Sequence, residues 1–179
     1  MQRRRYKSVD GDDRPSSLTH EERRKKVFER AGRLLAAKSR PVAELRERLL
    51  QGRHANETIV DEVIARLREY GYLDDERFAV TFASSKVRQK PTGRRRLERE
   101  LSLKKIDKGV AAQALDTVFA ETSEEDLIDR AIEKRIRLRG RPKTREEAKS
   151  LFDHLLRQGF PFEMVSDKVR AASKADLDE

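Results

Sequence analysis

The chain has 179 residues, of which 42% are charged, and it carries a formal net charge of +9. No apolar stretch approaches the ~18 residues that a membrane-spanning helix requires, and the first residues lack the apolar segment of a secretory signal. The absence of cysteine excludes disulfides, thiol nucleophiles and thiolate metal sites. We therefore expect a cytoplasmic protein with several thin cores, each shared by a few helices, in place of one thick core.

The first 19 residues are interpreted as a flexible basic arm. An arginine triplet at 3–5 is followed by turn-forming Asp, Gly, Pro and Ser residues, without apolar periodicity. Thr19 and Glu22 then have the spacing of a capping box. This spacing predicts a first helix over about 20–38.

Two more helices are predicted before residue 74. Pro41 is expected to be the first residue of the second helix, which Gly52 ends. Asn56 can cap the third, and Tyr70 and Gly71 end it.

Three helices are predicted in the middle of the chain. Asp74 or Asp75 caps the first of them, and the segment 91–93, Pro-Thr-Gly, breaks it. Leu97 marks the next helix, and Asp107 caps the third.

The last three helices follow in the same way. Ser123 opens a helix with Leu127 and Ala131 inward and Leu138 as a further inward candidate. Thr144 begins a second capping box. Gly159 ends that helix, and the following proline starts the last one.

These helices form a threefold repeat. Leucine pairs four residues apart recur at 45/49, 97/101 and 151/155, so the first members are separated by 52 and 54 residues. Period-2 alternation is absent, and we therefore predict an all-α chain of three tandem three-helix repeats. The expected segments are 1–19 as the arm, 20–73, 74–122 and 123–173 as repeats, and 174–179 as an acidic tail.

A nine-residue string lies at the first junction between repeats. It comprises Gly71, Tyr72, Leu73, Asp74, Asp75, Glu76, Arg77, Phe78 and Ala79. Gly71 supplies a left-handed residue that ends one helix, and the carboxylates suit the start of the next helix. Tyr72 and Leu73 can pack over the junction, so we interpret the string as setting the angle between repeats.

This string resembles a signature of the RecX family, and two further stretches support the resemblance. Gly93–Leu101 looks like the second-repeat helix of that family, and Leu155–Phe160 looks like its third repeat. The resemblance implies three tandem three-helix repeats in an elongated, curved chain. It also implies binding along the groove of the RecA nucleoprotein filament, with suppression of recombinase, ATPase and coprotease activity in DNA repair and the SOS response. Lys105 stands where the family has glycine, and because a left-handed lysine is costly we expect a differently built turn.

Positive charge is concentrated in two strips. Residues 86–105 hold nine basic and two acidic side chains, and residues 130–145 hold eight and one. Such clustering indicates a surface for a polyanion more strongly than bulk charge does. The candidate residues for binding RecA or DNA are Lys86, Arg88, Lys90, Arg94, Arg95, Arg96, Arg99, Lys104, Lys105, Arg135, Arg139, Arg141 and Lys143.

Arg94, Arg95 and Arg96 are the most suggestive of these. They fall in the first turn of a predicted helix, where cations oppose the helix dipole. A DNA phosphate or an acidic surface of RecA would offset that cost. The segment 139–143, Arg-Gly-Arg-Pro-Lys, is similar to the core of an AT-hook, but five residues are a weak signal and we favour a plain basic loop between helices.

Other functional classes find less support. Histidines 20, 54 and 154 are far apart, Tyr6 and Tyr70 are isolated, and no phosphate-binding glycine loop is present. We expect no enzymatic activity, no cofactor, no metal and no membrane contact, and a monomer that binds RecA, the RecA–DNA filament, and single- and double-stranded DNA. The alternative is a helix-turn-helix transcriptional or nucleoid protein, since short helix triads with a basic second helix would suit it.

Overall fold

The computed structural model describes residues 18–174. The predicted arm, apart from its last two residues, and the acidic tail from 175 onward lie outside these residues. The described part is built from nine α-helices and contains no strand. The helix bounds are α1 His20–Ala37, α2 Val42–Leu50, α3 Glu57–Glu69, α4 Asp75–Gln89, α5 Arg94–Leu103, α6 Lys108–Glu121, α7 Glu124–Arg139, α8 Arg145–Gln158 and α9 Phe162–Lys174.

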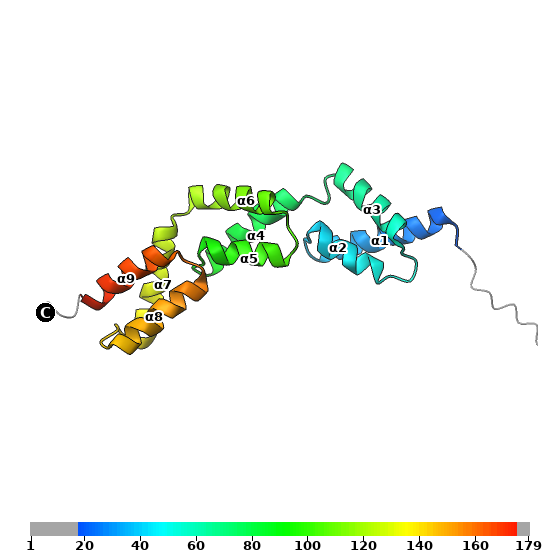
Figure 1. The fold of residues 1–179 in the computed structure, drawn as a ribbon. Helices are drawn as coiled ribbons and strands as arrows, with labels where there is room; N and C mark the ends of the chain where they lie inside the picture. Colours follow the sequence, from blue (N-terminus) through cyan, green and yellow to red (C-terminus); the bar gives the residue numbers. More distant parts are fainter. Residues whose placement is uncertain (1–17, 175–179) are drawn as a thin grey trace, which may run out of the picture.

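The helices form three successive triads along an elongated molecule (Figure 1). The principal helix packing occurs inside each triad: α1 with α2 and α3, α6 with α4 and α5, and α8 and α9 with α7. The prediction of an all-α chain of three-helix repeats is confirmed. We call α1–α3, α4–α6 and α7–α9 the first, second and third repeat, and we propose that they meet at 73–74 and 122–123.

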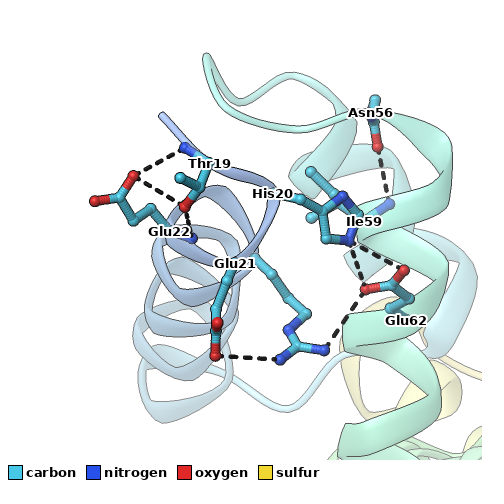
Figure 2. Close-up of polar contacts among 8 residues, drawn as sticks. Thr19, His20, Glu21, Glu22, Asn56, Ile59 and Glu62 are labelled. Carbon is cyan, nitrogen blue, oxygen red and sulfur yellow. Dashed lines mark hydrogen bonds and ion pairs between the residues drawn. The ribbon is translucent and has the colours of Figure 1, made fainter. Parts of the chain in front are cut away.

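The predicted caps account for where the helices begin. The capping box is formed by Thr19 and Glu22, and Figure 2 shows it at the start of α1. Asn56 accepts a hydrogen bond from the Ile59 N–H at 2.8 Å, which caps α3. His20 lies on α1 with its Nε2 3.1 Å from an oxygen of Glu62 on α3, so the two helices are also joined by a polar contact.

The apolar residues form two clusters within the described chain. One lies inside the first repeat and runs from Val27 to Leu73. The other is continuous through the second and third repeats, from Phe78 to Val169. The sequence predicted several thin cores, but the second and third repeats share one because their inward faces meet.

An acidic residue connects each repeat to the one before it. Asp75, the first residue of α4, accepts a hydrogen bond from the Val42 N–H at the start of α2, at 2.9 Å. Glu124, the first residue of α7, accepts from the Arg94 N–H at the start of α5, at 2.8 Å. The middle helix of one repeat is thus capped by the first helix of the next.

The turn at Lys105 differs from the expectation. Lys105 has φ 59°, and the Ile106 N–H donates to the Leu101 carbonyl at 3.2 Å. This is the six-to-one bond of a Schellman turn, which Gly159 closes in the third repeat with φ 92°. The prediction of a differently built turn is therefore wrong: the chain keeps the turn and places a lysine in the left-handed region.

Three smaller expectations also fail. Pro41 is the residue before α2, with extended backbone, and is not its first helical residue. Pro161 likewise precedes α9, which begins at Phe162. Leu138 is 72% exposed, whereas Ile136 in the same turn of α7 packs against the core.

Candidate nucleic-acid interface

Most cations of the first basic strip, residues 86–105, form ion pairs with carboxylates of the same chain. Lys86 Nζ lies 2.7 Å from one oxygen of Glu100, and Arg96 Nε lies 3.1 Å from the other. Partial burial raises the pKa of Glu100, but the hydrogen bonds from Lys86 and Arg96 outweigh it and lower the pKa below its ordinary value. Glu100 is therefore ionised near neutral pH and balances charge from both cations.

The start of α5 is docked against the end of α8. The Gly93 N–H donates to the Gln158 carbonyl at 2.9 Å, and the Arg95 N–H donates to the Gly159 carbonyl at 3.2 Å. Arg96 also donates from its guanidinium to the Arg157 carbonyl at 3.4 Å. The negative end of α8 thus meets the positive start of α5 and its arginines.

This docking changes the interpretation of the arginine triplet. Arg94 Nη2 lies 2.6 Å from Asp116 Oδ1, and Arg96 contacts Glu100 and the end of α8. The cost of cations in this first turn is therefore offset inside the protein, so an external anion is not needed to explain it. Arg95 and Arg99 remain exposed on α5, as do Arg88 and Lys90 at the end of α4.

Lys104 and Lys105 lie at the junction with the first repeat. Lys104 Nζ lies 5.3 Å from the centre of the Phe82 ring and 3.9 Å from Glu44 Oε2 on α2. Lys105 pairs with Glu47, also on α2. These two candidates connect repeats in the structure.

The second basic strip, residues 130–145, differs from the first because three of its arginines line a depression in the surface. Arg135, Arg139 and Arg141 line a hollow of about 160 Å³ between the end of α7 and α8. The only carboxylate in its lining is Glu147, which also accepts from the Lys143 N–H at 2.7 Å in the loop before α8. The structure thus brings together three of the arginines that the sequence singled out.

A second depression of about 160 Å³ adjoins the first and joins the two strips. It is lined by Lys90 from the end of α4, Lys134 and Arg135 from α7, and His154 and Gln158 from α8, together with apolar atoms. Arg135 lines both hollows, and its guanidinium donates to the Ser150 hydroxyl at 3.1 Å. We call Lys90, Arg135, Arg139, His154 and Arg157 the basic cluster.

The cluster carries uncompensated positive charge. Burial lowers the pKa of His154, and Arg135, Lys90, Arg157 and Arg139 lower it further. Burial also lowers the pKa of Arg135, with Arg139 and Arg157 adding to the effect. Among the ion pairs of residues 18–174, none involves a member of this cluster. An anion bound here would relieve mutual repulsion.

Sequence reasoning missed part of this cluster. The sequence selected Lys90, Arg135 and Arg139 as candidates, but not His154 or Arg157. His154 and Arg157 are three residues apart on one helix face, and Arg135 and Arg139 are four apart on another. Those spacings were visible, but nothing in the sequence shows that the two faces oppose each other.

The junction string has the expected structural features, with one exception. Asp74 caps α4, Leu73, Phe78 and Ala79 are buried, and Arg77 donates to the Gly71 carbonyl at 2.8 Å. Tyr72, expected to pack over the junction, is instead 65% exposed.

The sequence suggested that Tyr70 is isolated, but its ring contacts that of Tyr72 edge to face, with ring centres 6.2 Å apart. Arg66 lies over the same ring, 4.9 Å from its centre. Tyr70 and Arg66 also line a larger depression of about 520 Å³ between α1 and α3. The charged side chains around that depression are equally divided in sign, which does not suit a polyanion.

Comparison with known proteins identifies the family. The chain is 31% identical over 146 residues to the regulatory protein RecX of Chlorobium phaeobacteroides, covering 81% of this chain and 92% of that one. It is 33% identical over 160 residues to the RecX of Amycolatopsis mediterranei, covering 87% and 90%. The chain belongs to the RecX family of regulatory proteins.

Other matches agree with this assignment. Residues 74–115 match the family described as RecX, second three-helix domain. The chain spans 53–59% of the length of three Bacillus RecX proteins to which it is 30% identical. The crystal structure of RecX from Lactobacillus salivarius has the same fold, with a TM-score of 0.75 at 19% identity over 87% of this chain and 99% of that one.

Two kinds of feature are absent from the part of the chain that the structure describes. Residues 18–174 contain no group of three His, Asp or Glu side chains placed to hold a metal ion. No helix in the same part of the chain has the length and apolar character to cross a bilayer.

Proposed function

We propose that this chain binds the RecA nucleoprotein filament and DNA, and restrains the recombinase, ATPase and coprotease activities of RecA in DNA repair and the SOS response. The proposal extends the regulatory role of the RecX family to a partner and a mode of action. It involves no chemistry by the chain itself.

The observation that carries the proposal is the basic cluster with its two adjoining depressions. Five cationic or protonatable side chains from α4, α7 and α8 converge there, and no member has an acidic partner within residues 18–174. Unpaired arginines repel each other, and a guanidinium can bind a phosphate through two parallel hydrogen bonds. A DNA backbone would supply such phosphates in a regular row.

The helix-turn-helix alternative receives less support from the same contacts. A recognition helix presents its N-terminal residues to base edges in the major groove. In α5, the basic second helix, that end is covered by the Gln158 and Gly159 carbonyls and by Glu124. The basic side chains of α5 that stay exposed, Arg95 and Arg99, suit a phosphate more than a base edge.

The direct test is the DNA-stimulated ATPase of RecA, measured with strand exchange while this protein is added in substoichiometric amounts. We expect both activities to fall. Unchanged activities at every ratio, together with tight binding to naked DNA, would favour the helix-turn-helix alternative.

The site is tested by paired variants. Arg139→Gln with Arg141→Gln should weaken DNA and filament binding, and should flatten the logarithmic dependence of affinity on salt by roughly 0.7–0.9 per lost phosphate contact. Loss of filament binding with unchanged affinity for naked DNA would assign these arginines to acidic residues of RecA. Unchanged affinity for both ligands in a folded variant would remove the loop from the interface.

The same assay separates the two halves of the first strip. Arg95→Gln with Arg99→Gln changes exposed side chains and should affect binding without affecting stability. Arg94→Gln with Arg96→Gln breaks the contacts to Asp116 and Glu100 and should also lower the melting temperature. Equal stability of the two double variants would contradict the docking role of Arg94 and Arg96.

A further inference from the structure

The depression between the second and third repeats is formed by residues that no single repeat holds. Lys90 and Pro91 come from the end of α4, Lys134 and Arg135 from α7, and His154 from α8. Its lining within the described chain contains no carboxylate, and Asp153, which precedes His154 on α8, is not part of it. The position at a junction distinguishes this hollow from a solvated basic face on one helix.

The size of the hollow limits what can enter. Its volume of about 160 Å³ corresponds to the liquid volume of roughly five water molecules. Pockets for whole nucleotides or drug-sized molecules are larger, at about 300 Å³ and above. One tetrahedral anion fits the space.

The donors at the rim match such an anion. Lysine supplies a point charge, arginine supplies a planar fork, and a protonated imidazole supplies a further N–H. Arg135 is already held by its hydrogen bond to Ser150 at 3.1 Å, so part of the fork is oriented before any ligand binds.

We propose that this hollow binds a phosphate group between Lys90, Arg135 and His154, and that His154 gains a proton when the phosphate binds. The proposal deepens the polyanion binding of the proposed function by assigning one phosphate subsite and a pH dependence to it. A phosphate held here contacts the second and third repeats together.

The proton uptake follows from the charges around the imidazole. Lys90 faces it from the end of α4, Lys134, Arg135 and Arg139 from α7, and Arg157 from α8. In the free protein, burial, together with Arg135, Lys90, Arg157 and Arg139, holds the pKa of His154 below its ordinary value, so the ring is neutral at neutral pH. A bound anion reverses the sign of the nearest charge and raises that pKa. Between the two values, binding takes up a proton, and affinity rises as pH falls.

The experiment uses two anions whose own charge is constant from about pH 5.5 to 8.5, an interval that spans the ordinary pKa of histidine near 6.5. Sulfate represents a free tetrahedral anion, and a short oligothymidylate represents a backbone phosphodiester. For the full chain we expect both to bind about tenfold more tightly at the lower pH. Binding of the oligonucleotide alone would assign the site to nucleic acid, and binding of sulfate alone would assign it to a free anion; each result retains the phosphate subsite.

Variants identify the group responsible. His154→Gln should lose the pH dependence and bind as the full chain does at high pH. Arg135→Gln should weaken binding about tenfold at both pH values. Arg137→Gln removes the same charge from the opposite face of α7, outside the lining of either hollow, and should have a much smaller effect. A pH dependence that survives His154→Gln would overturn the proposal, as would equal effects of the two arginine variants.

A measurement on the unaltered chain tests the subsite even if the variants fail to fold. The ring protons of His154, followed by NMR against pH, should titrate at higher pH when sulfate is present than when it is absent. An unmoved His154 titration overturns the subsite. If sulfate raises the pH at which His154 titrates but the chain does not inhibit RecA, the proposed function is contradicted and the phosphate subsite is retained.

Discussion

The junction between the first and second repeats and the junction between the second and third are stabilised by different interactions. Between the first and second repeats the apolar clusters are separate, and the contacts across the junction include Lys104 with Glu44 and Lys105 with Glu47. Between the second and third repeats the core is continuous, and backbone hydrogen bonds join Gly93 to Gln158. The same three-helix unit is therefore joined once through charge and once through packing.

This difference has a physical consequence. Exposed ion pairs contribute little and are screened by salt, whereas a shared apolar core and buried backbone hydrogen bonds are not. We infer that the first junction is the more easily deformed of the two, while the second keeps the basic cluster in place. The following predictions test that comparison.

The largest effect is expected for Gly93→Ala at the second junction. A Cβ there would lie 2.4 Å from the Gly159 carbonyl carbon and 2.5 Å from the Phe160 nitrogen, both backbone atoms. Because backbone cannot move aside cheaply, we expect a loss near the upper end of the roughly 1–3 kcal/mol that overpacking costs, measured by urea unfolding.

Gly32→Ala is the matched control for that variant. Gly32 lies inside α1, and a Cβ there would meet nothing within 4 Å. It should stabilise the protein by about 0.5–1 kcal/mol, because alanine favours the helix interior. Similar losses for both variants would show that Gly93 has no special packing role.

A smaller, matched effect is expected for the carboxylates that cap across the junctions. Asp75→Ala removes the acceptor at the start of α2, and Glu124→Ala removes it at the start of α5. Each should cost about 1 kcal/mol, as lost helix caps do. Glu76→Ala, an exposed residue in the first turn of α4, should cost about 0.3 kcal/mol through the helix dipole alone. Equal losses at Asp75 and Glu76 would contradict the capping across repeats.

The smallest effect is expected at Lys105, where strain and attraction oppose each other. Lys105→Gly should relieve about 1 kcal/mol of left-handed strain but lose an exposed pair worth less than about 1 kcal/mol. The variant should therefore be nearly neutral at low salt and stabilised in 1 M NaCl, where the pair is screened.

Lys105→Ala completes the test because it removes the pair and keeps the strain. It should be less stable than Lys105→Gly by about 1 kcal/mol at every salt concentration. If the two variants are equally stable, the left-handed turn at this position carries no strain.

The positions of the helices follow from local sequence, because their causes are local. Thr19, Asn56 and Thr144 cap helices where the capping pattern predicted them, and Gly71 and Gly159 end helices in the left-handed region. Leucines 45, 97 and 151 are buried at equivalent places in the three repeats. A cap or a helix face depends on residues within one or two turns, so these features could be predicted without the fold.

The candidate site could be predicted only in part. The clustering of arginine on the second strip indicated a polyanion surface, and Arg135, Arg139 and Arg141 do share one hollow. The same reasoning selected Lys86 and Arg96, which pair with Glu100. A charge count treats all exposed-looking cations alike, because it cannot show which carboxylate lies opposite each one.

Composition and periodicity alone determined the helical class, the threefold repeat and the surplus of positive charge. Tertiary structure alone decided which cations remain unpaired, because that depends on the docking of α5 against the end of α8 and of α7 against α8. It also decided that His154 and Arg157 face Arg135 and Lys90, residues that lie more than fifteen positions away in the sequence. Local interactions set where a helix begins and ends, but the balance of charge at a site is a property of the surfaces that folding brings together.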